Sequence, residues 1–307
     1  MSGSPAMLEE ALARADAARA GLRDDEGLEV YRLFHGYSEG VPGLEIDRYG
    51  DAAILTGKGA SEAELAAAGA WLRGLGRFEL IVLRERGRPV SVLHGTMPGE
   101  PLVVREAGLR YAIEPWAAGN PGLYLDARPA RRWLQSSSEG RRVLNLFSFA
   151  GSLGVAALAG GAASVTHVDS QRRALERCAA NHALNAQRSD ARDRVREDVP
   201  RFLRRAARGE RRFGGVILDP PPGPEDGAQR DALTPLALAG PCAALVERGG
   251  WILVFFHHDP RSWDELEEAF AASAKRPLEV LWRGRSGSDF PEAEEKRTLR
   301  LSAFRLS

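Results

Sequence analysis

The second half of the chain alternates short apolar runs with segments of helical length. The runs have the length of strands that are buried on both faces of a sheet. These predicted strands are residues 143–147, 165–168, 194–197, 213–218 and 251–256. Helices are predicted at residues 153–158, 172–185, 202–208 and 233–248, and after the capping box Ser262-x-x-Glu265. This alternation predicts a doubly wound α/β sheet of parallel strands, followed by a terminal antiparallel hairpin at residues 278–283 and 298–306.

Residues 1–113 follow a different pattern. Residues 4–21 carry leucines at roughly helical spacing, which predicts one amphipathic helix. From Leu28 onward, short strands flank a single predicted helix at residues 62–75, an order that is typical of a small α+β domain. The predicted strands are residues 31–34, 44–49, 52–56, 79–84, 102–106 and 109–113. We therefore expect an N-terminal helix at 1–27, a small α+β domain at 28–113 and a sheet domain at 114–307.

Composition narrows the partners and the compartment. Lys+Arg and Asp+Glu number 42 each, so the net charge is zero and does not imply a strong general attraction to nucleic acid. Any contact with RNA would need a local basic patch. The two cysteines, Cys178 and Cys242, both fall inside predicted helices, so neither a disulfide framework nor a metal site is expected. The N-terminus lacks a signal-peptide pattern, and no apolar window reaches membrane-spanning length. A cytoplasmic protein is therefore expected.

Candidate chemistry lies at the ends of the first two predicted strands of the sheet. Residues 148–151 form a loop after the first strand, and Asp169 ends the second. Ligands of doubly wound sheets bind outside the carboxyl ends of the strands. Gly151 lets the backbone approach a ligand closely, and the Asp169 carboxylate can accept hydrogen bonds from both hydroxyls of a ribose. Together they predict a cofactor that contains a nucleoside.

Two cofactor classes fit such a site, and a third interpretation needs no cofactor. A dinucleotide favours the pattern G-x-G-x-x-G. Here Phe149 occupies the first glycine position, and only Gly151 and Gly154 match. S-adenosylmethionine carries no phosphate and does not need the full set of glycines. Alternatively, the glycines only turn the chain within an ordinary α/β unit.

Two further acids follow predicted strands. Asp198 can either accept a hydrogen bond from an adenine amino group or cap the helix that begins near Val199. Asp219 is followed by Pro220 and Pro221, which fix φ and remove amide donors. A stiff loop that presents carbonyl groups can hold a planar base, although it can also be a purely structural turn.

Together these motifs resemble those of the class I S-adenosylmethionine-dependent methyltransferases. The matching segments are Asp219-Pro-Pro, Asn145-Leu-Phe-Ser-Phe-Ala-Gly, Val168-Asp169 and Tyr124-Leu-Asp-x-Arg128. More narrowly, the chain resembles the bacterial 23S ribosomal RNA large-subunit methyltransferases that modify cytosine C5 or guanine N7, whose middle domain is similar to residues 33–50. The resemblance covers about residues 30 to 307. It implies a Rossmann-like seven-stranded sheet in the order 3-2-1-4-5-7-6, with strand 7 antiparallel.

The resemblance also implies a role for each matching residue. Asp169 would hold the ribose hydroxyls and Asp198 the adenine edge. Phe147, Ser148 and Gly151 would line the methionine and ribose side, and Tyr124, Asp126 and Arg128 would close the site near the methionine. Asp219, Pro220 and Pro221 would border the target atom and position the substrate. The residues expected around the cofactor are Tyr124, Asp126, Arg128, Asn145, Phe147, Ser148, Gly151, Asp169, Ser170, Asp198, Val199 and Asp219.

Three departures from the resemblance bear on the reaction. Methylation of cytosine C5 needs a cysteine thiolate to attack C6. Such enzymes place this cysteine just after strand 5, where residues 256–259 of this chain are Phe-His-His-Asp. Amino-group methyltransferases usually follow the two prolines with an aromatic residue, whereas Pro222 stands here. Relatives of the C5 type often begin with a small RNA-binding PUA domain, for which the residues before Leu28 leave no room.

We therefore expect methyl transfer to a ring nitrogen of ribosomal RNA, such as guanine N7, rather than to cytosine C5. The small domain and arginines would contact phosphates. His257 and His258 could bind phosphate, act as a base or simply lie in an exposed loop. The alternatives are a degenerate relative that binds cofactor or RNA only, a protein or small-molecule methyltransferase, and a nicotinamide-dependent oxidoreductase. The chain could be a monomer or a homodimer.

Overall fold

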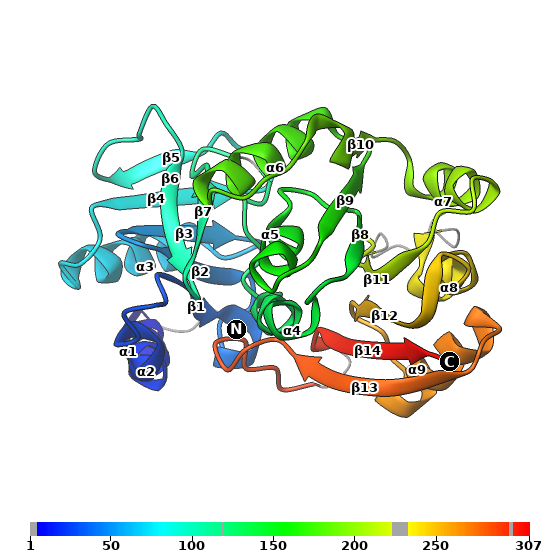
Figure 1. Cartoon of the computed structure of the whole chain (residues 1–307). Helices are drawn as coiled ribbons and strands as arrows, with labels where there is room; N and C mark the ends of the chain where they lie inside the picture. Colours follow the sequence, from blue (N-terminus) through cyan, green and yellow to red (C-terminus); the bar gives the residue numbers. More distant parts are fainter. Residues whose placement is uncertain (1–4, 118, 223–232, 295–296) are drawn as a thin grey trace. The chain divides into compact units, whose positions relative to one another are not determined.

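The computed structural model describes residues 5–117, 119–222, 233–294 and 297–307. The chain forms two compact units (Figure 1). The first contains Met1–Leu125 and Gly287–Ala293, and the second contains Asp126–Ser286 and Glu294–Ser307. The first unit therefore takes in the N-terminal helix and a short segment from near the end of the chain. No helix among the described residues is both long and apolar enough to cross a membrane.

A five-stranded sheet forms the centre of the first unit. Its strands, in spatial order, are β1 (Val30–His35), β2 (Leu44–Tyr49), β3 (Ala52–Gly57), β4 (Leu80–Glu85) and β5 (Ser91–His94). Neighbouring strands are antiparallel except β3 and β4, which are parallel and are connected by α3 (Glu62–Gly74). A separate antiparallel hairpin follows, made of β6 (Leu102–Glu106) and β7 (Leu109–Ile113). The short η1 helix (Gly36–Glu39) lies between β1 and β2.

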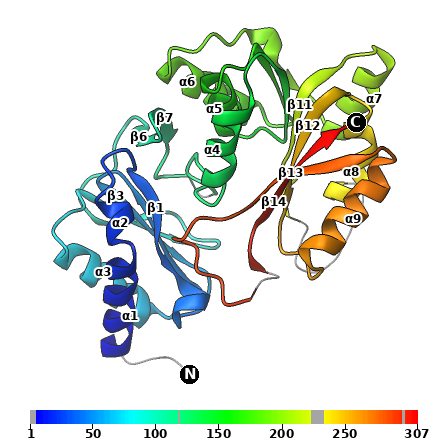
Figure 2. The ribbon, with the colours of Figure 1, turned by 60° about the horizontal axis from the view of Figure 1, so that its bottom comes forward.

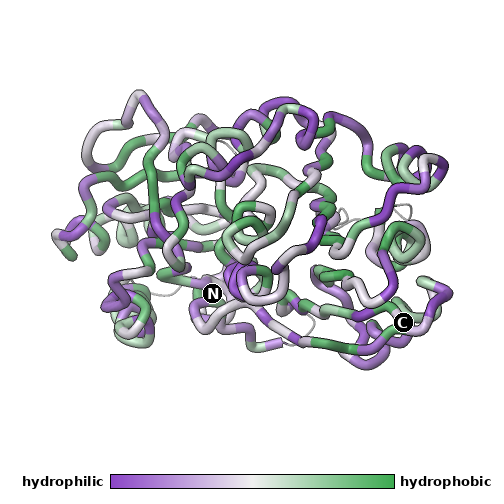
Figure 3. The backbone as a smooth tube through the Cα atoms, in the orientation of Figure 1, coloured by the Kyte–Doolittle hydropathy of each residue, from purple (hydrophilic) through white to green (hydrophobic). Residues whose placement is uncertain are grey.

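The N-terminal helix packs onto this sheet. It forms α1 (Pro5–Ala18) and a single turn, α2 (Ala20–Arg23), close to the expected residues 4–21. Leu8 and Leu12 are buried in one hydrophobic core with Phe34 of β1 and Leu55 of β3. Both hydrophobic and hydrophilic positions occur along α1 and α2 (Figure 3), as expected for an amphipathic helix.

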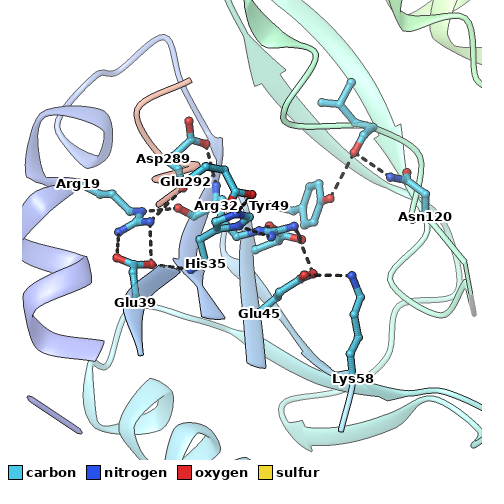
Figure 4. Close-up of polar contacts among 12 residues, drawn as sticks. Arg19, Arg32, His35, Glu39, Glu45, Tyr49, Lys58, Asn120, Asp289 and Glu292 are labelled. Atoms are coloured by element: carbon cyan, nitrogen blue, oxygen red, sulfur yellow. Dashed lines mark hydrogen bonds and ion pairs between the residues drawn. The ribbon is translucent and has the colours of Figure 1, made fainter. Parts of the chain in front are cut away.

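A polar network attaches residues 287–293 to the first unit. The chain leaves β13 (Leu278–Arg285), passes through this segment and returns to β14 (Arg300–Leu306) (Figure 2). Asp289 is fully buried, and its carboxylate accepts a hydrogen bond from the amide of Arg32 at 2.9 Å. The guanidinium of Arg19 donates to the carbonyl of Asp289 at 2.9 Å and pairs with Glu39 (Figure 4).

The second unit contains a seven-stranded sheet in the order β10-β9-β8-β11-β12-β14-β13. The strands not yet bounded are β8 (Arg142–Leu146), β9 (Ser164–Asp169), β10 (Arg194–Arg196), β11 (Phe213–Leu218) and β12 (Val246–Phe256). From β10 to β12 all pairs are parallel, whereas β14 is antiparallel to both of its neighbours. The expected order 3-2-1-4-5-7-6 with strand 7 antiparallel is therefore confirmed, as is the Rossmann-like α/β fold.

Helices cover both faces of this sheet (Figure 2). On one face lie α4 (Arg128–Ser137), α5 (Ser152–Ala159) and α6 (Arg172–Leu184). On the other face α7 (Val199–Arg208), α8 (Pro235–Ala243) and α9 (Trp263–Ala274) share a hydrophobic core with the central strands. The short η2 helix (Ala191–Asp193) precedes β10. Because helices cover both faces, we expect a ligand of this sheet at the ends of its strands.

The structure differs from the predicted elements in two places. The helix predicted at 233–248 is wrong at its end, because α8 stops at Ala243 and β12 begins at Val246. Gly249 has φ 76° and interrupts the regular pairing of β12 with β11 without ending the strand. The short strand β5 was not predicted, since its four residues are largely exposed and carry no alternating apolar pattern.

Candidate functional site

Polar residues gather at one edge of the seven-stranded sheet. Because five neighbouring strands are parallel, their carboxyl ends share this edge. The loop 147–151 follows β8, and Asp169 is the last residue of β9. Asp198 lies two residues after β10, Asp219 directly follows β11, and His257 directly follows β12. The edge therefore assembles groups from five separate places in the sequence.

The loop after β8 adopts an unusual backbone. Phe147 has φ 55° and Phe149 has φ 44°, a left-handed region that bulky residues rarely occupy. The amide of Ser148 donates to the carbonyl of Val168 at 3.1 Å, which ties the loop to the neighbouring strand β9. Backbone strain of this kind persists only where surrounding contacts hold it, and it concentrates at functional sites.

A side chain at position 151 would collide with α6. The φ of Gly151 is 76°, and a Cβ atom added there would lie 2.4 Å from the Sγ atom of Cys178 on α6. The glycine therefore lets the loop turn tightly into α5 while α6 packs closely against it. This contact gives Cys178 a structural role, and burial raises the pKa of its thiol to about 12.

Asp169 connects the loop to the end of β9. One carboxylate oxygen, Oδ2, accepts a hydrogen bond from the amide of Phe149 at 2.8 Å, and Oδ1 accepts from the amide of Gln171 at 2.9 Å. Each carboxylate oxygen can accept a second hydrogen bond. Beside it, the hydroxyl of Ser148 is buried and has no hydrogen-bond partner in the part of the chain that the structure describes. Polar groups with spare capacity therefore line this loop, which fits a polar ligand such as S-adenosylmethionine.

Three of the predicted cofactor residues lie farther along the same edge. The carboxylate of Asp198 accepts a hydrogen bond from the amide of Arg201 and caps α7, which is the structural alternative considered from the sequence. Its second oxygen has room for another donor. Val199 is buried in the core beneath, so it can offer a ligand backbone only, and Ser170 is exposed next to Asp169.

Asn145 belongs to a buried chain of hydrogen bonds rather than to the open edge. Its side-chain amide lies 3.3 Å from Nδ1 of His167, and Nε2 of His167 lies 2.9 Å from Nε2 of His182. Nδ1 of His182 then contacts Gln187, which donates to the carbonyl of Val155. If every step donates in one direction, both histidines are neutral and both nitrogens of each ring are used.

The same two histidines lie close to Cys178, and their ligand atoms all fall within 4.8 Å of one another. Such a trio could hold a metal ion. However, a metal would have to replace the hydrogen bond between His167 and His182. Burial holds the pKa of His167 well below its ordinary value and lowers that of His182, in keeping with neutral rings. The geometry therefore assigns these histidines to the hydrogen-bond chain.

Asp219 and His257 form an ion pair at the ends of β11 and β12. Oδ1 of Asp219 lies 2.8 Å from Nε2 of His257, and about a fifth of each side chain is exposed. Burial raises the pKa of Asp219, and the charge of Asp126 adds to this effect. Burial alone would lower the pKa of His257, but its hydrogen bond to Asp219 and the charge of Asp219 raise it overall.

A pocket of about 170 Å³ lies beside this pair. Its walls are the three prolines after Asp219, the start of α8 and the end of β12. His257 lines the pocket, together with Asp259 and Arg261, whose side chains pair with each other at 2.6 Å. His258 lies outside this lining and has φ 44°. The two neighbouring histidines are therefore distinct in position.

The segment Tyr124–Arg128 crosses from one unit to the other. Tyr124 belongs to the first unit and is half exposed. Arg128 begins α4 and is buried, with Pro129 in the first turn as predicted. Asp126 lies near enough to Asp219 and His257 to raise the pKa of both groups. Of the three, Asp126 is thus the one that joins the strand-end edge.

Sequence reasoning missed two features of the site. The pairing of Asp219 with His257 was not predicted, although both residues directly follow strands that are neighbours in the expected order. The expected strand order therefore contained enough information to predict this pair. The chain from Asn145 through His167 and His182 was also missed, because no local spacing links residues from β8, β9 and α6.

Comparisons with known proteins point to one family. Residues 54–223 match the family model described as S-adenosylmethionine-dependent methyltransferase. The chain is 32% identical over 236 residues to ribosomal RNA large subunit methyltransferase I of Shewanella amazonensis, which covers 71% of this chain and 58% of that protein. It is 35% identical over 237 residues to ribosomal RNA large subunit methyltransferase of Deinococcus radiodurans, with 70% and 56% covered. The chain thus spans less than two thirds of the length of these relatives.

Solved structures share the fold. A candidate SAM-dependent methyltransferase from Streptococcus mutans matches with a TM-score of 0.89 at 21% identity, covering 99% of this chain and 82% of that one. The structure of a candidate methyltransferase complexed with SAH also scores 0.89, at 22% identity with the same coverage. At such identities the likeness establishes the fold alone. The family model, which covers more than half of the chain, and the curated relatives show that this chain belongs to the S-adenosylmethionine-dependent methyltransferase family.

Proposed function

We propose that this protein transfers a methyl group from S-adenosylmethionine to a ring nitrogen in ribosomal RNA, in the cytoplasm. The observation that carries the proposal is the junction of Asp169 with the strained loop at the sheet's carboxyl edge. It is supported by the family match and by relatives that are named ribosomal RNA large subunit methyltransferases.

The cofactor would be held by this chain's own residues along the edge. The carboxylate of Asp169 would accept hydrogen bonds from the ribose hydroxyls, and Asp198 would receive the adenine amino group through its spare oxygen. The unpartnered hydroxyl of Ser148 and the backbone of Phe147 and Gly151 would line the ribose and methionine. The proposed set is completed by Tyr124, Asp126, Arg128, Asn145, Ser170 and Val199. Asn145 would support the loop from the buried strand beneath it. When bound, the sulfonium supplies the methyl group.

The burial of both cysteines argues against cytosine C5 as the target. Cys178 is buried beneath Gly151, and its pKa is raised to about 12, so it supplies no thiolate at neutral pH. Cys242 is fully buried in α8, where burial also raises its pKa. A ring nitrogen attacks the methyl group with its own lone pair and needs no such thiolate. Guanine N7 carries a free lone pair, and the imide nitrogens of guanine and uracil gain one when they lose their proton.

Positioning would supply much of the rate. Pro220 and Pro221 follow Asp219 and stiffen the loop that borders the target atom. Holding two reactants in line can lower a barrier by roughly 7–11 kcal/mol. The stiff loop and the pocket beside it would hold a planar base opposite the methyl group.

Methyl transfer to purified RNA tests the proposal. The protein is incubated with tritiated S-adenosylmethionine and ribosomal RNA from a strain that lacks the gene, and the digested nucleosides are identified by mass spectrometry. We expect one methylated nucleoside, lost with Asp169→Ala and kept with the matched surface variant Asp264→Ala. Cofactor binding without any incorporation into RNA would favour a degenerate relative, and incorporation only into protein would favour a protein methyltransferase.

A further inference from the structure

Two neighbouring strands present an oriented imidazole at the edge of the proposed target pocket. His257 directly follows β12, and its Nε2 atom lies 2.8 Å from the carboxylate of Asp219, which directly follows β11. The ring of Phe255 lies nearly parallel to it, at 24° with the ring centroids 6.2 Å apart. A carboxylate on one side and an aromatic ring beside it fix the direction in which the second nitrogen points.

That second nitrogen, Nδ1, is the free end of the pair. Within the described chain, the contact with Asp219 is the single hydrogen bond that His257 makes. About a fifth of the His257 side chain is exposed, and Nδ1 makes no hydrogen bond within the described chain. His257 also lines the pocket of about 170 Å³ beside the three prolines. Nucleophile-activating sites share this arrangement, in which a carboxylate orients an imidazole and the other ring nitrogen faces the reacting group.

We infer that His257 is the catalytic proton acceptor of this enzyme and that Asp219 is its positioning residue. This inference rests on the proposed function. In the step, the lone pair of the acceptor nitrogen forms a bond to the methyl carbon while the bond from carbon to sulfur breaks. The sulfur keeps that electron pair and becomes a neutral thioether. The hydrogen on the acceptor nitrogen passes as a proton to Nδ1 of His257, which becomes an imidazolium paired with Asp219.

A proton acceptor narrows the class of substrate. Methylation of guanine N7 uses a free lone pair and releases no proton. A proton acceptor made of His257 and Asp219 would therefore have no role in that reaction. A ring nitrogen that carries hydrogen must lose a proton when it gains a methyl group. Guanine N1 and uracil N3 are the ring nitrogens of this kind in unmodified RNA. The geometry therefore favours an imide nitrogen over the N7 atom that the sequence alone suggested.

The charges around His257 set the pH range of this step. Asp219 faces it from the end of β11, and Asp126 acts on it from the segment before α4. Asp259 and Arg261, on the loop after β12, line the same pocket and neutralise each other. The net effect raises the pKa of His257 above its ordinary 6.5. Because the neutral ring is the base, the rate should rise with pH in a range above 6.5.

Single-turnover methyl transfer to ribosomal RNA tests the assignment, with four proteins compared between pH 6 and 9. These are the wild type, His257→Gln, Asp219→Asn and the neighbour control His258→Asn, which suits the positive φ at that position. We expect His257→Gln to lose 10²–10⁴-fold in rate at pH 7.5, with SAH affinity measured by calorimetry unchanged within twofold. The wild-type rise with pH should vanish in this variant. In Asp219→Asn, the rise in rate should occur at lower pH, because the carboxylate charge that raises the pKa of His257 has been removed. His258→Asn should stay within threefold of the wild type.

The possible results distinguish failure of the proton-acceptor assignment from failure of the proposed function. If the wild type is active and His257→Gln is as fast as His258→Asn, or the product is 7-methylguanosine, the proton-acceptor assignment is overturned while the proposed function stands. If the wild type binds SAH but methylates no ribosomal RNA, the proposed function fails and the assignment falls with it. A product identified as 1-methylguanosine or 3-methyluridine, with the expected pH profiles, supports both. Should His257→Gln fail to fold, the wild-type and Asp219→Asn profiles still decide.

Discussion

Asp169 accepts a hydrogen bond from the amide of Phe149 at 2.8 Å, and this contact joins the end of β9 to the loop after β8. One carboxylate therefore serves two purposes. It holds a loop whose backbone is strained at two aromatic residues, and each of its oxygens can still accept a second hydrogen bond. Shape and chemistry of the proposed cofactor site thus depend on the same side chain.

Replacement of Asp169 tests this double role. We expect Asp169→Ala to weaken SAH binding by at least 100-fold, since charged hydrogen bonds contribute about 1.5–3 kcal/mol each. Asp169→Asn keeps one acceptor oxygen and should lose less, about tenfold. Isothermal titration calorimetry measures both, with the exposed Asp264→Ala on α9 as control. Equal affinity in all four proteins would remove Asp169 from the cofactor site.

Because Gly151 contacts Cys178, we expect the effects of substitutions at these two positions on stability to be coupled. Gly151→Ala places a methyl group 2.4 Å from Sγ and forces φ 76° on an alanine. We expect a loss of about 2–5 kcal/mol in the free energy of unfolding, from overpacking and left-handed strain together. Adding Cys178→Ala should recover part of the overpacking, which urea unfolding of the double-mutant cycle measures. Strictly additive effects would contradict the contact. Gly74→Ala, in open space on α3, should cost nothing.

The buried histidine chain predicts a loss of stability in mild acid. Burial keeps the pKa of His167 well below 6.5 and also lowers that of His182, whereas both take up protons near pH 6.5 when the chain unfolds. The unfolded state then binds more protons, so stability falls as pH drops below 6.5, by up to about 1.4 kcal/mol per pH unit for each histidine. His182→Gln should reduce this slope between pH 6.5 and 5. Urea unfolding at several pH values would refute the idea if His182→Gln and the exposed His94→Gln gave the same slope.

The hydrogen bond from the Arg32 amide to Asp289 should help to hold residues 287–293 on the first unit. Asp289→Ala removes the acceptor of the part-buried hydrogen bond from the Arg32 amide, which should cost about 1–3 kcal/mol in unfolding free energy. Residues 287–293 should then be cut faster by protease under native conditions. His35 and Glu292, 2.7 Å apart, would hold the rest of the segment less well on their own (Figure 4). Unchanged cleavage relative to Asp264→Ala would show that this network does not secure the segment.

Much of the sheet domain follows from local sequence signals. Apolar runs gave the central strands, and Ser262 caps α9 through the predicted capping box. The Asp-Pro-Pro motif placed the end of β11 at Leu218, because the first proline cannot continue a paired strand. The strand order came from resemblance, since spacing alone does not fix which strands are neighbours.

Features built from distant residues could not be read from the chain. The helix predicted at 233–248 overran because Gly249-Gly250 looked like a boundary, whereas Gly249 adopts a left-handed bulge inside β12. The closeness of Gly151 and Cys178 depends on how α5 and α6 pack, which no local pattern encodes. Tertiary packing decided each of these points.

We propose that the nucleoside of the cofactor lies on the carboxyl edge of the seven-stranded sheet, held by Asp169. A crystal structure of the protein with SAH tests it most directly. We expect both ribose hydroxyls within hydrogen-bond distance of the Asp169 carboxylate and the sulfur directed toward the loop that begins with Asp219. Density for the nucleoside anywhere else in the molecule, with this edge closed by side chains, would contradict it.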